Sequence, residues 1–269
     1  TRTHVSGSAG RIGNVKLSAK TISGVVLNSG ETFSYNQTVG QRTEARGYKP
    51  APAYVKGETV DEVGGGICQT SSTLYLACLL SNLEITERYA HRYVPAYISP
   101  GMDATVSWGG PDYKFTNNTL YPIKIVTSYS GGYLTVKILG TKTDSTYVKM
   151  TNEKLSTTNY EVVYEDDDTL APGTEQVKTT PYTGSKWKTY RNIYDANGKL
   201  ISSNFEASSD YKVRNKVILR GPAAQPGSGS AEIPAAPSTD TPAQENPTPT
   251  EPDIPAEPEN PTIVVPAET

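Results

Sequence analysis

Hydrophobic residues are most concentrated in one segment of the chain, at 70–83, TSSTLYLACLLSNL. Every position from Leu74 to Leu80 in this segment is apolar. A helix that is apolar on all sides is buried on most of them. The three hydroxyl residues at 70–72 can accept hydrogen bonds from free N–H groups, so we expect one of them to be the N-cap. The pattern predicts a central, buried helix.

Alternating and mixed patterns surround this helix. The segment 84–98, EITERYAHRYVPAYI, alternates between apolar and polar residues and predicts a strand that carries His91. The segment 121–140 predicts a hairpin that turns at a Ser-Gly-Gly sequence. The segment 14–27 begins with a helical pattern and ends apolar. Together these elements predict an α+β domain over residues 1–145.

The pattern changes near residue 146, where short alternating segments replace any helical periodicity. The sequence DANGKL at 195–200 contains an Asn-Gly pair, which is typical of tight hairpin turns. We therefore predict an elongated all-β module over residues 146–221 with a thin core. The remaining segment, 222–269, holds 12 of the chain's 20 prolines and no aromatic residue. Such a composition cannot bury enough apolar area to offset its ordering entropy, so it predicts a disordered Pro-rich tail.

Charge and hydropathy exclude some classes of function. The tail carries eight acidic residues and no basic residue after Arg220, whereas residues 1–220 carry 25 basic and 20 acidic residues. No stripe of Lys and Arg is present, so nucleic acid binding is not predicted. No run approaches 18 apolar residues, so no transmembrane segment is predicted. Because the chain begins at Thr1 and has no apolar anchor, we expect it to be a fragment of a longer protein.

The sequence GGGICQTSSTLY at 64–75 is the candidate site for chemistry. It places Cys68 at the start of the predicted helix, where amide dipoles lower the pKa of a thiol. The glycines Gly64, Gly65 and Gly66 would let the backbone approach a substrate, and their N–H groups could bind an oxyanion. Gln69 could donate a further hydrogen bond. The pattern is typical of a nucleophilic cysteine.

Such a cysteine needs a base, and the chain has only His4 and His91. A helix over 70–83 extends about 21 Å from Cys68, and eight extended residues return about 26 Å, so His91 is expected beside the helix start. Asp103 or Asp112 could orient the imidazole, and we favour Asp103 because it lies at the clearer junction of a turn and a strand.

A purely structural interpretation remains open for the same residues. Free cysteine is common in protein cores, a glycine-rich turn can serve packing alone, and a histidine can be a structural hydrogen-bonding group. Cys68 and Cys78 are about 15 Å apart along one helix and are not expected to form a disulfide. Two cysteines and two histidines lack the spacing of a metal site, and no cofactor is predicted. Arg46 is either the basic edge of a groove or part of a solvated turn.

Two stretches resemble known families. GETFSYNQTVGQRTEARGYKPA, VGGGICQTSSTLYLACLLSNLEITERYAHRYVPAYISPGMDATVSW and DYKFTNNTLYPIKI resemble the VanW family over roughly residues 10–140. LAPGTEQVKTTPYTGSKWKTYRNIYDANGKLISS resembles the five-glycine (G-five) domain, although its PYTGSKW segment departs from the more usual pair of glycines.

These resemblances imply a bacterial cell-envelope protein that is extracellular or associated with the cell wall. VanW proteins are associated with vancomycin-resistance clusters, and five-glycine domains are thought to bind polymers that contain N-acetylglucosamine. The implied partner is peptidoglycan or such a polymer, and Trp187 and Tyr190 are candidate sugar-stacking residues that we expect to be exposed. Two functions remain open: a cysteine-dependent peptidase or transpeptidase acting on stem peptides, or a non-catalytic wall-binding module linked to glycopeptide resistance.

Overall fold

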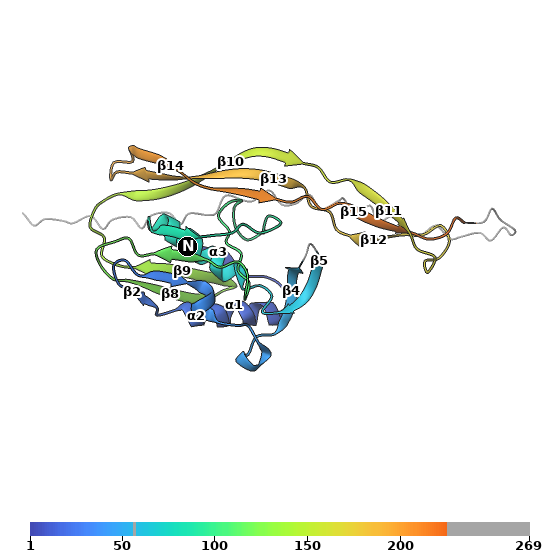
Figure 1. The fold of residues 1–269 in the computed structure, drawn as a ribbon, viewed down its shortest axis with the longest axis horizontal. Helices are drawn as coiled ribbons and strands as arrows, with labels where there is room; N and C mark the ends of the chain where they lie inside the picture. Colours follow the sequence, from blue (N-terminus) through green and yellow to red (C-terminus); the bar gives the residue numbers. More distant parts are fainter. Residues whose placement is uncertain (56–57, 225–269) are drawn as a thin grey trace, which may run out of the picture. The chain divides into compact units, whose positions relative to one another are not determined.

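The computed structural model describes residues 1–55 and 58–224, and this described chain is mostly β-structure with a few helices (Figure 1). The predicted Pro-rich tail at 222–269 lies almost wholly outside the described residues. Below, residues 1–139 are called the N-terminal region and residues 147–220 the β-region.

A four-stranded sheet forms the base of the N-terminal region. Its strand order is β1 (Arg2–His4), β9 (Tyr133–Leu139), β8 (Ile123–Ser130) and β2 (Val26–Leu27). Strands β8 and β9 pair antiparallel through Gly131 and Gly132, which have φ values of 57° and 82°. A side chain is strained at such φ values, so glycine suits this turn. The predicted hairpin is therefore confirmed.

Helices α1 (Ala9–Ile22) and α3 (Cys68–Leu80) pack against this sheet (Figure 1). The other elements of the region are smaller. They are the sheet of β3 (Thr32–Ser34), β7 (Lys114–Thr116) and β6 (Glu84–Glu87), the hairpin of β4 (Pro50–Val55) and β5 (Glu58–Val63), the short helix α2 (Tyr35–Val39) and the 3-10 helix η1 (Glu44–Arg46).

Helix α3 is the centre of the core, as its apolar sequence predicts. Leu74, Tyr75 and Leu79 have no exposed surface. The helix begins at Cys68, two residues before the expected position, so the prediction that residues 70–72 provide the N-cap is wrong. Its end is set by Asn82, whose φ of 55° stops the helix while the next N–H donates back to the carbonyl of Cys78.

Two other predicted elements differ from the structure. Helix α1 begins at Ala9, with the Ser8 side chain as its N-cap, and not near residue 14. Its early glycines resemble helix breakers in the sequence, but a Cβ at Gly10 would lie 2.9 Å from the carbonyl oxygen of Pro50, so glycine is needed for packing. The strand predicted over 84–98 ends at Glu87, and His91 lies in the loop that follows.

The β-region contains two three-stranded sheets and, in its described residues, no helix, as predicted. One sheet has the order β10 (Tyr147–Thr158), β13 (Gly184–Tyr194), β14 (Leu200–Tyr211), and the other has the order β11 (Val162–Asp166), β15 (Lys216–Arg220), β12 (Glu175–Thr179). The Asn-Gly turn joins β13 to β14, with Gly198 at a φ of 80°. Most side chains of β11 and β12 are exposed, so the core is thin there.

Candidate active site at the start of helix α3

The loop that carries Asp103 is fixed to the first turn of α3 by the hydroxyl residues of that helix. The Ser71 hydroxyl donates to the carbonyl oxygen of Ala104 at 2.7 Å, and the Ala104 N–H donates to the Ser72 Oγ at 3.0 Å. All three residues are buried, so these bonds are shielded from water. The position of Asp103 relative to Cys68 is therefore set by the polar cluster that follows the cysteine.

Asp103 in turn holds His91. Its Oδ2 lies 2.6 Å from the His91 Nδ1 and also accepts the His91 backbone N–H at 2.7 Å. Because Asp103 occupies Nδ1, the nitrogen left to interact with the thiol of Cys68 is Nε2. The His91 side chain is 17% exposed and Cys68 is half-buried. The structure thus brings together Cys68, His91 and Asp103, the three residues singled out in the sequence.

The thiol of Cys68 lies among hydrogen-bond donors that favour its charged form, and the Val106 carbonyl oxygen, 3.4 Å from Sγ, can accept the thiol proton. The Val106 N–H donates to Sγ at 3.5 Å, and the Thr105 hydroxyl lies 3.7 Å from it. Burial alone would raise the pKa of Cys68, but the hydrogen bond and charge of His91, aided by Val106 and Thr105, lower it below the ordinary value of a thiol.

The same contacts act on His91 in the opposite sense. Burial alone would lower its pKa, but hydrogen bonds with Asp103 and Cys68 raise it to about 9. The pKa of Asp103 is lowered: its burial would raise it, but His91, Arg88 and Tyr211 outweigh that effect. Between the lowered pKa of Cys68 and the raised pKa of His91, the arrangement therefore favours a thiolate beside an imidazolium, which is the reactive form of a catalytic cysteine.

Three further charged or titratable side chains face this group. Arg11 donates to the Gln69 Oε1 at 2.8 Å, and burial lowers its pKa while the nearby Cys68 and Tyr97 oppose that shift. The Tyr97 hydroxyl lies 3.5 Å from the His91 Nε2. Arg88 pairs with the Asp103 Oδ1 at 2.9 Å. None of the three was singled out from sequence, because nothing in their local patterns points to Cys68.

The three glycines before Cys68 fill packing roles. A Cβ at Gly65 would clash with the carbonyl oxygen of Ala51, and those at Gly64 and Gly66 would press on Arg42 and Arg11. The N–H groups of Gly64 and Gly65 donate to Lys49 and Glu62, so they are not free for an oxyanion. Within the described residues, the N–H groups of Gly66 and Cys68 have no acceptor and remain available.

Gln69 lies in a place that differs from the one expected, whereas Arg46 lies in an exposed turn, one of the two alternatives. The Gln69 amide nitrogen donates to the Thr3 hydroxyl at 3.0 Å and to the His4 carbonyl at 2.7 Å, and the side chain is buried. Its amide hydrogens are thus used within the fold. Arg46 lies on the exposed η1 and donates to the Gln41 carbonyl, whereas the arginine whose charge reaches Cys68 is Arg11.

The candidate sugar-stacking residues do not form one platform. Trp187 and Tyr190 are both half-buried, which corrects the expectation that they are exposed. They are three residues apart on β13, so they project from opposite faces of the sheet. Tyr190 instead pairs across the strands with Phe205, with ring centroids 6.3 Å apart, and Phe205 is 58% exposed. Phe205 was not singled out from sequence, although its aromatic side chain in an alternating polar segment was a usable signal.

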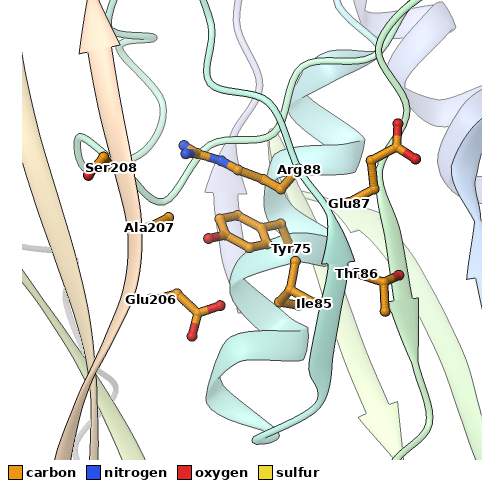
Figure 2. Close-up of a pocket in the computed structure, with 8 residues that line it drawn as sticks. All are labelled: Tyr75, Ile85, Thr86, Glu87, Arg88, Glu206, Ala207 and Ser208. Carbon is orange, nitrogen blue, oxygen red and sulfur yellow. The ribbon is translucent and has the colours of Figure 1, made fainter.

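Other features of the described residues lie outside this group. Cys78 is fully buried, and burial raises its pKa to about 12. The described chain contains no cluster of three or more His, Cys, Asp or Glu side chains that could hold a metal ion. It also contains no helix long and apolar enough to cross a membrane. A small open pocket of about 190 Å³ lies between the segment 85–88, Tyr75 and strand β14 (Figure 2).

The fold and this geometry define a mostly β protein with a Cys-His-Asp group at a helix start. Residues 10–139 match the family described as VanW like protein, and residues 149–223 match the G5 domain. The chain therefore carries a match to the VanW-like family followed by a match to the G5 domain, in the order that the quoted motifs predict.

Two curated relatives match part of the chain. The chain is 49% identical over 133 residues to "Uncharacterized protein YoaR" of Bacillus subtilis, a match that covers 49% of this chain and 44% of the relative. It is 35% identical over 115 residues to "Vancomycin B-type resistance protein VanW" of Enterococcus faecalis, which covers 40% of this chain and 42% of the relative. The chain thus spans less than half the length of either relative.

Two solved structures match part of the chain at low similarity. The "IgA1 Protease G5 domain structure" shares 16% identity with a TM-score of 0.22, covering 30% of this chain and 98% of that one. The "Crystal structure of HP0197-G5" shares 16% identity with a TM-score of 0.17, covering 28% and 97%. At these TM-scores the likeness carries no argument.

The lowered pKa of Cys68 predicts how the alkylation rate of its thiol depends on pH. Iodoacetamide should alkylate Cys68 at pH values at which an ordinary thiol, with a pKa of about 8.5, is mostly protonated. As the pH falls through the pKa of Cys68, the thiolate gains a proton and the rate should fall. In His91→Gln the midpoint of the rate profile should move upward, because the main group that stabilises the thiolate is lost. Mass spectrometry of the two cysteine peptides measures both rates.

The buried Cys78 serves as the internal control and should stay unmodified in the folded protein. If Cys68 and Cys78 react equally slowly, or if His91→Gln leaves the Cys68 profile unchanged, the thiol is not activated by its surroundings.

Proposed function

We propose that the N-terminal region is a cysteine-dependent amidase that acts on peptide amides of the bacterial cell wall, as a peptidase or transpeptidase. The observation that carries this proposal is the hydrogen bond between Asp103 and His91, together with the interaction of His91 with the thiol of Cys68 at the first residue of α3. A nucleophile, a base and an orienting carboxylate in this order are the parts that acyl transfer needs.

The first chemical step uses the thiolate directly. Cys68 Sγ attacks the carbonyl carbon of a substrate amide, a C–S bond forms, and the carbonyl electron pair moves to oxygen. The N–H groups of Gly66 and Cys68, together with the positive end of α3, would stabilise this oxyanion. Because Gly64 and Gly65 donate elsewhere, they are not part of this oxyanion site.

The second step uses the proton already on His91. As the C–N bond breaks, His91 donates its Nε2 proton to the leaving amine, and an acyl thioester remains on Cys68. His91, now neutral, can accept a proton from water or from an acceptor amine that attacks the thioester. Attack by water gives a peptidase, and attack by an amine gives a transpeptidase. Asp103 stays charged throughout and holds the ring in place.

The substrate class rests on the family and on the β-region. A curated relative bears the name of a vancomycin B-type resistance protein, and vancomycin resistance concerns the bacterial cell wall. The β-region matches the G5 domain. We therefore assign the protein to the cell wall, with stem-peptide amides as the substrate of the N-terminal region and N-acetylglucosamine-containing polymers as the ligand of the β-region.

Within the β-region, the pair of Tyr190 and Phe205 is the best candidate contact for a sugar. The two rings lie next to each other on neighbouring strands, and Phe205 leaves 58% of its surface open. Sugar rings present apolar C–H faces that stack on aromatic side chains. Trp187 is less available because the ammonium of Lys154 lies 5.1 Å from its ring centre.

Replacing the nucleophile should remove activity without loss of stability. Cys68→Ser should abolish conversion of purified muropeptides, followed by mass spectrometry, and should leave the melting temperature nearly unchanged. Cys78→Ser is the matched control and should do the reverse. A hydroxyl buried at this fully enclosed position should cost about 1–3 kcal/mol of stability while turnover of the folded fraction persists.

The wild-type protein must convert at least one muropeptide for this account to hold. If it converts none, and Cys68→Ser destabilises the fold instead, the thiol is structural. The N-terminal region is then a non-catalytic wall-binding module.

Removing the exposed ring of the β-region should weaken wall binding. Phe205→Ala in the full chain should reduce retention on purified peptidoglycan several-fold in a pull-down assay, because a stacking contact is lost. Trp108→Ala is the matched control, since Trp108 is similarly exposed, at 53%, but lies in the N-terminal region. Equal retention of Phe205→Ala and wild type would remove this surface from consideration.

A further inference from the structure

The carboxylate that orients His91 is also held by the β-region. Tyr211, the last residue of β14, donates its hydroxyl to the Asp103 Oδ1 at 2.5 Å. The same hydroxyl oxygen accepts the Gly101 N–H at 2.6 Å, and the Tyr211 side chain is buried. Tyr211 and Asp103 are 108 residues apart in sequence. One hydroxyl therefore links the β-region to both the backbone and the carboxylate of the Asp103 loop.

Arg88 provides a second link between the Asp103 loop and β14, through Ser209, two residues before Tyr211 on the strand. The Arg88 Nη2 binds the Asp103 Oδ1 at 2.9 Å and its Nε binds the Asp103 carbonyl at 2.6 Å, while its Nη1 donates to the Ser209 hydroxyl at 2.9 Å. Ser209 and Tyr211 share one face of β14 because side chains alternate along a strand. Figure 2 shows the guanidinium of Arg88 extending toward the strand that carries Ala207 and Ser208.

Further bonds fix β13 and β14 against the loop that carries His91. The Lys212 N–H donates to the Arg92 carbonyl at 2.7 Å, one residue after His91. The Arg191 Nη1 donates to the Leu83 carbonyl at 2.8 Å, at the end of α3. Both ends of the segment that carries His91 are thus tied to the β-region. If the β-region moved away, these bonds and the bond from Tyr211 to the Asp103 carboxylate would be lost together.

We propose that Tyr211 is a positioning residue of the Cys68–His91–Asp103 group, so that the active site is complete only while β14 is docked. The inference rests on the proposed function of Cys68. The Tyr211 hydroxyl and Arg88 together occupy Oδ1, which leaves Oδ2 directed at the two N–H groups of His91. Without the hydroxyl the carboxylate can rotate, and His91 loses the bond that keeps its Nε2 toward the thiol.

The test compares Tyr211→Phe with wild type in the full chain, using the pH profile of Cys68 alkylation by iodoacetamide. We expect the midpoint to rise by about one pH unit, which is about a tenfold lower thiolate fraction below the midpoint. Tyr147→Phe is the matched control, because it removes the hydroxyl of a tyrosine on β10 of the same sheet, whose ring stacks on Tyr194. Its profile should equal that of wild type.

A profile of Tyr211→Phe that is unchanged, or that shifts to lower pH, overturns the proposal. If Tyr211→Phe fails to fold, Ser209→Ala tests the same surface, since it removes only the bond from Arg88, and an unchanged midpoint in that variant also counts against the proposal. The alkylation readout does not depend on turnover. If Tyr211→Phe shifts the midpoint but wild type converts no muropeptide, the positioning role stands and the proposed enzyme function fails.

Discussion

The structure around the candidate site depends on one buried charge, the carboxylate of Asp103. It has no exposed surface and accepts hydrogen bonds from the His91 ring, the His91 backbone, Arg88 and Tyr211. Leaving a buried charge without its partner costs on the order of 3–5 kcal/mol, so the segments that supply these donors must be ordered together. The loop after β6, the start of α3 and strand β14 are therefore parts of one arrangement, and the same arrangement keeps a proton on His91 beside Cys68.

The sequence predicted those parts of the site that depend on local pattern. A glycine-rich turn before an apolar helix predicted that Cys68 lies at a helix start. Comparing the length of that helix with the length of the extended segment after it predicted that His91 lies at the same end. Asp103 was favoured over Asp112 from its position at a turn, and Asp112 instead binds Ser34 and the Asn36 N–H. The hairpin at Gly131 and the Asn-Gly turn followed from glycine's tolerance of positive φ.

The remaining features required long-range contacts that no local pattern contains. The alternation of apolar and polar residues around His91 is typical of a strand, but the His91 N–H donates to Asp103 and not to a neighbouring strand. From the sequence, the glycines before Cys68 were expected to let a substrate approach the backbone. In the structure, the side chain of Arg11 and the carbonyl of Ala51 occupy the space beside them. Tyr211 lies in a segment that the sequence assigns to a separate module, so its bond to Asp103 could not be predicted.

The protonation state of His91 at neutral pH tests the central claim most directly. An NMR titration of the labelled full chain, with the His91 ring signals assigned from the His4→Gln variant, measures it. The account predicts a midpoint of about 9, because Asp103 and the Cys68 thiolate both favour the charged ring. The midpoint should fall in Cys68→Ala, where the thiolate is absent. A midpoint near the ordinary histidine value of about 6.5 that is unchanged in Cys68→Ala would contradict it.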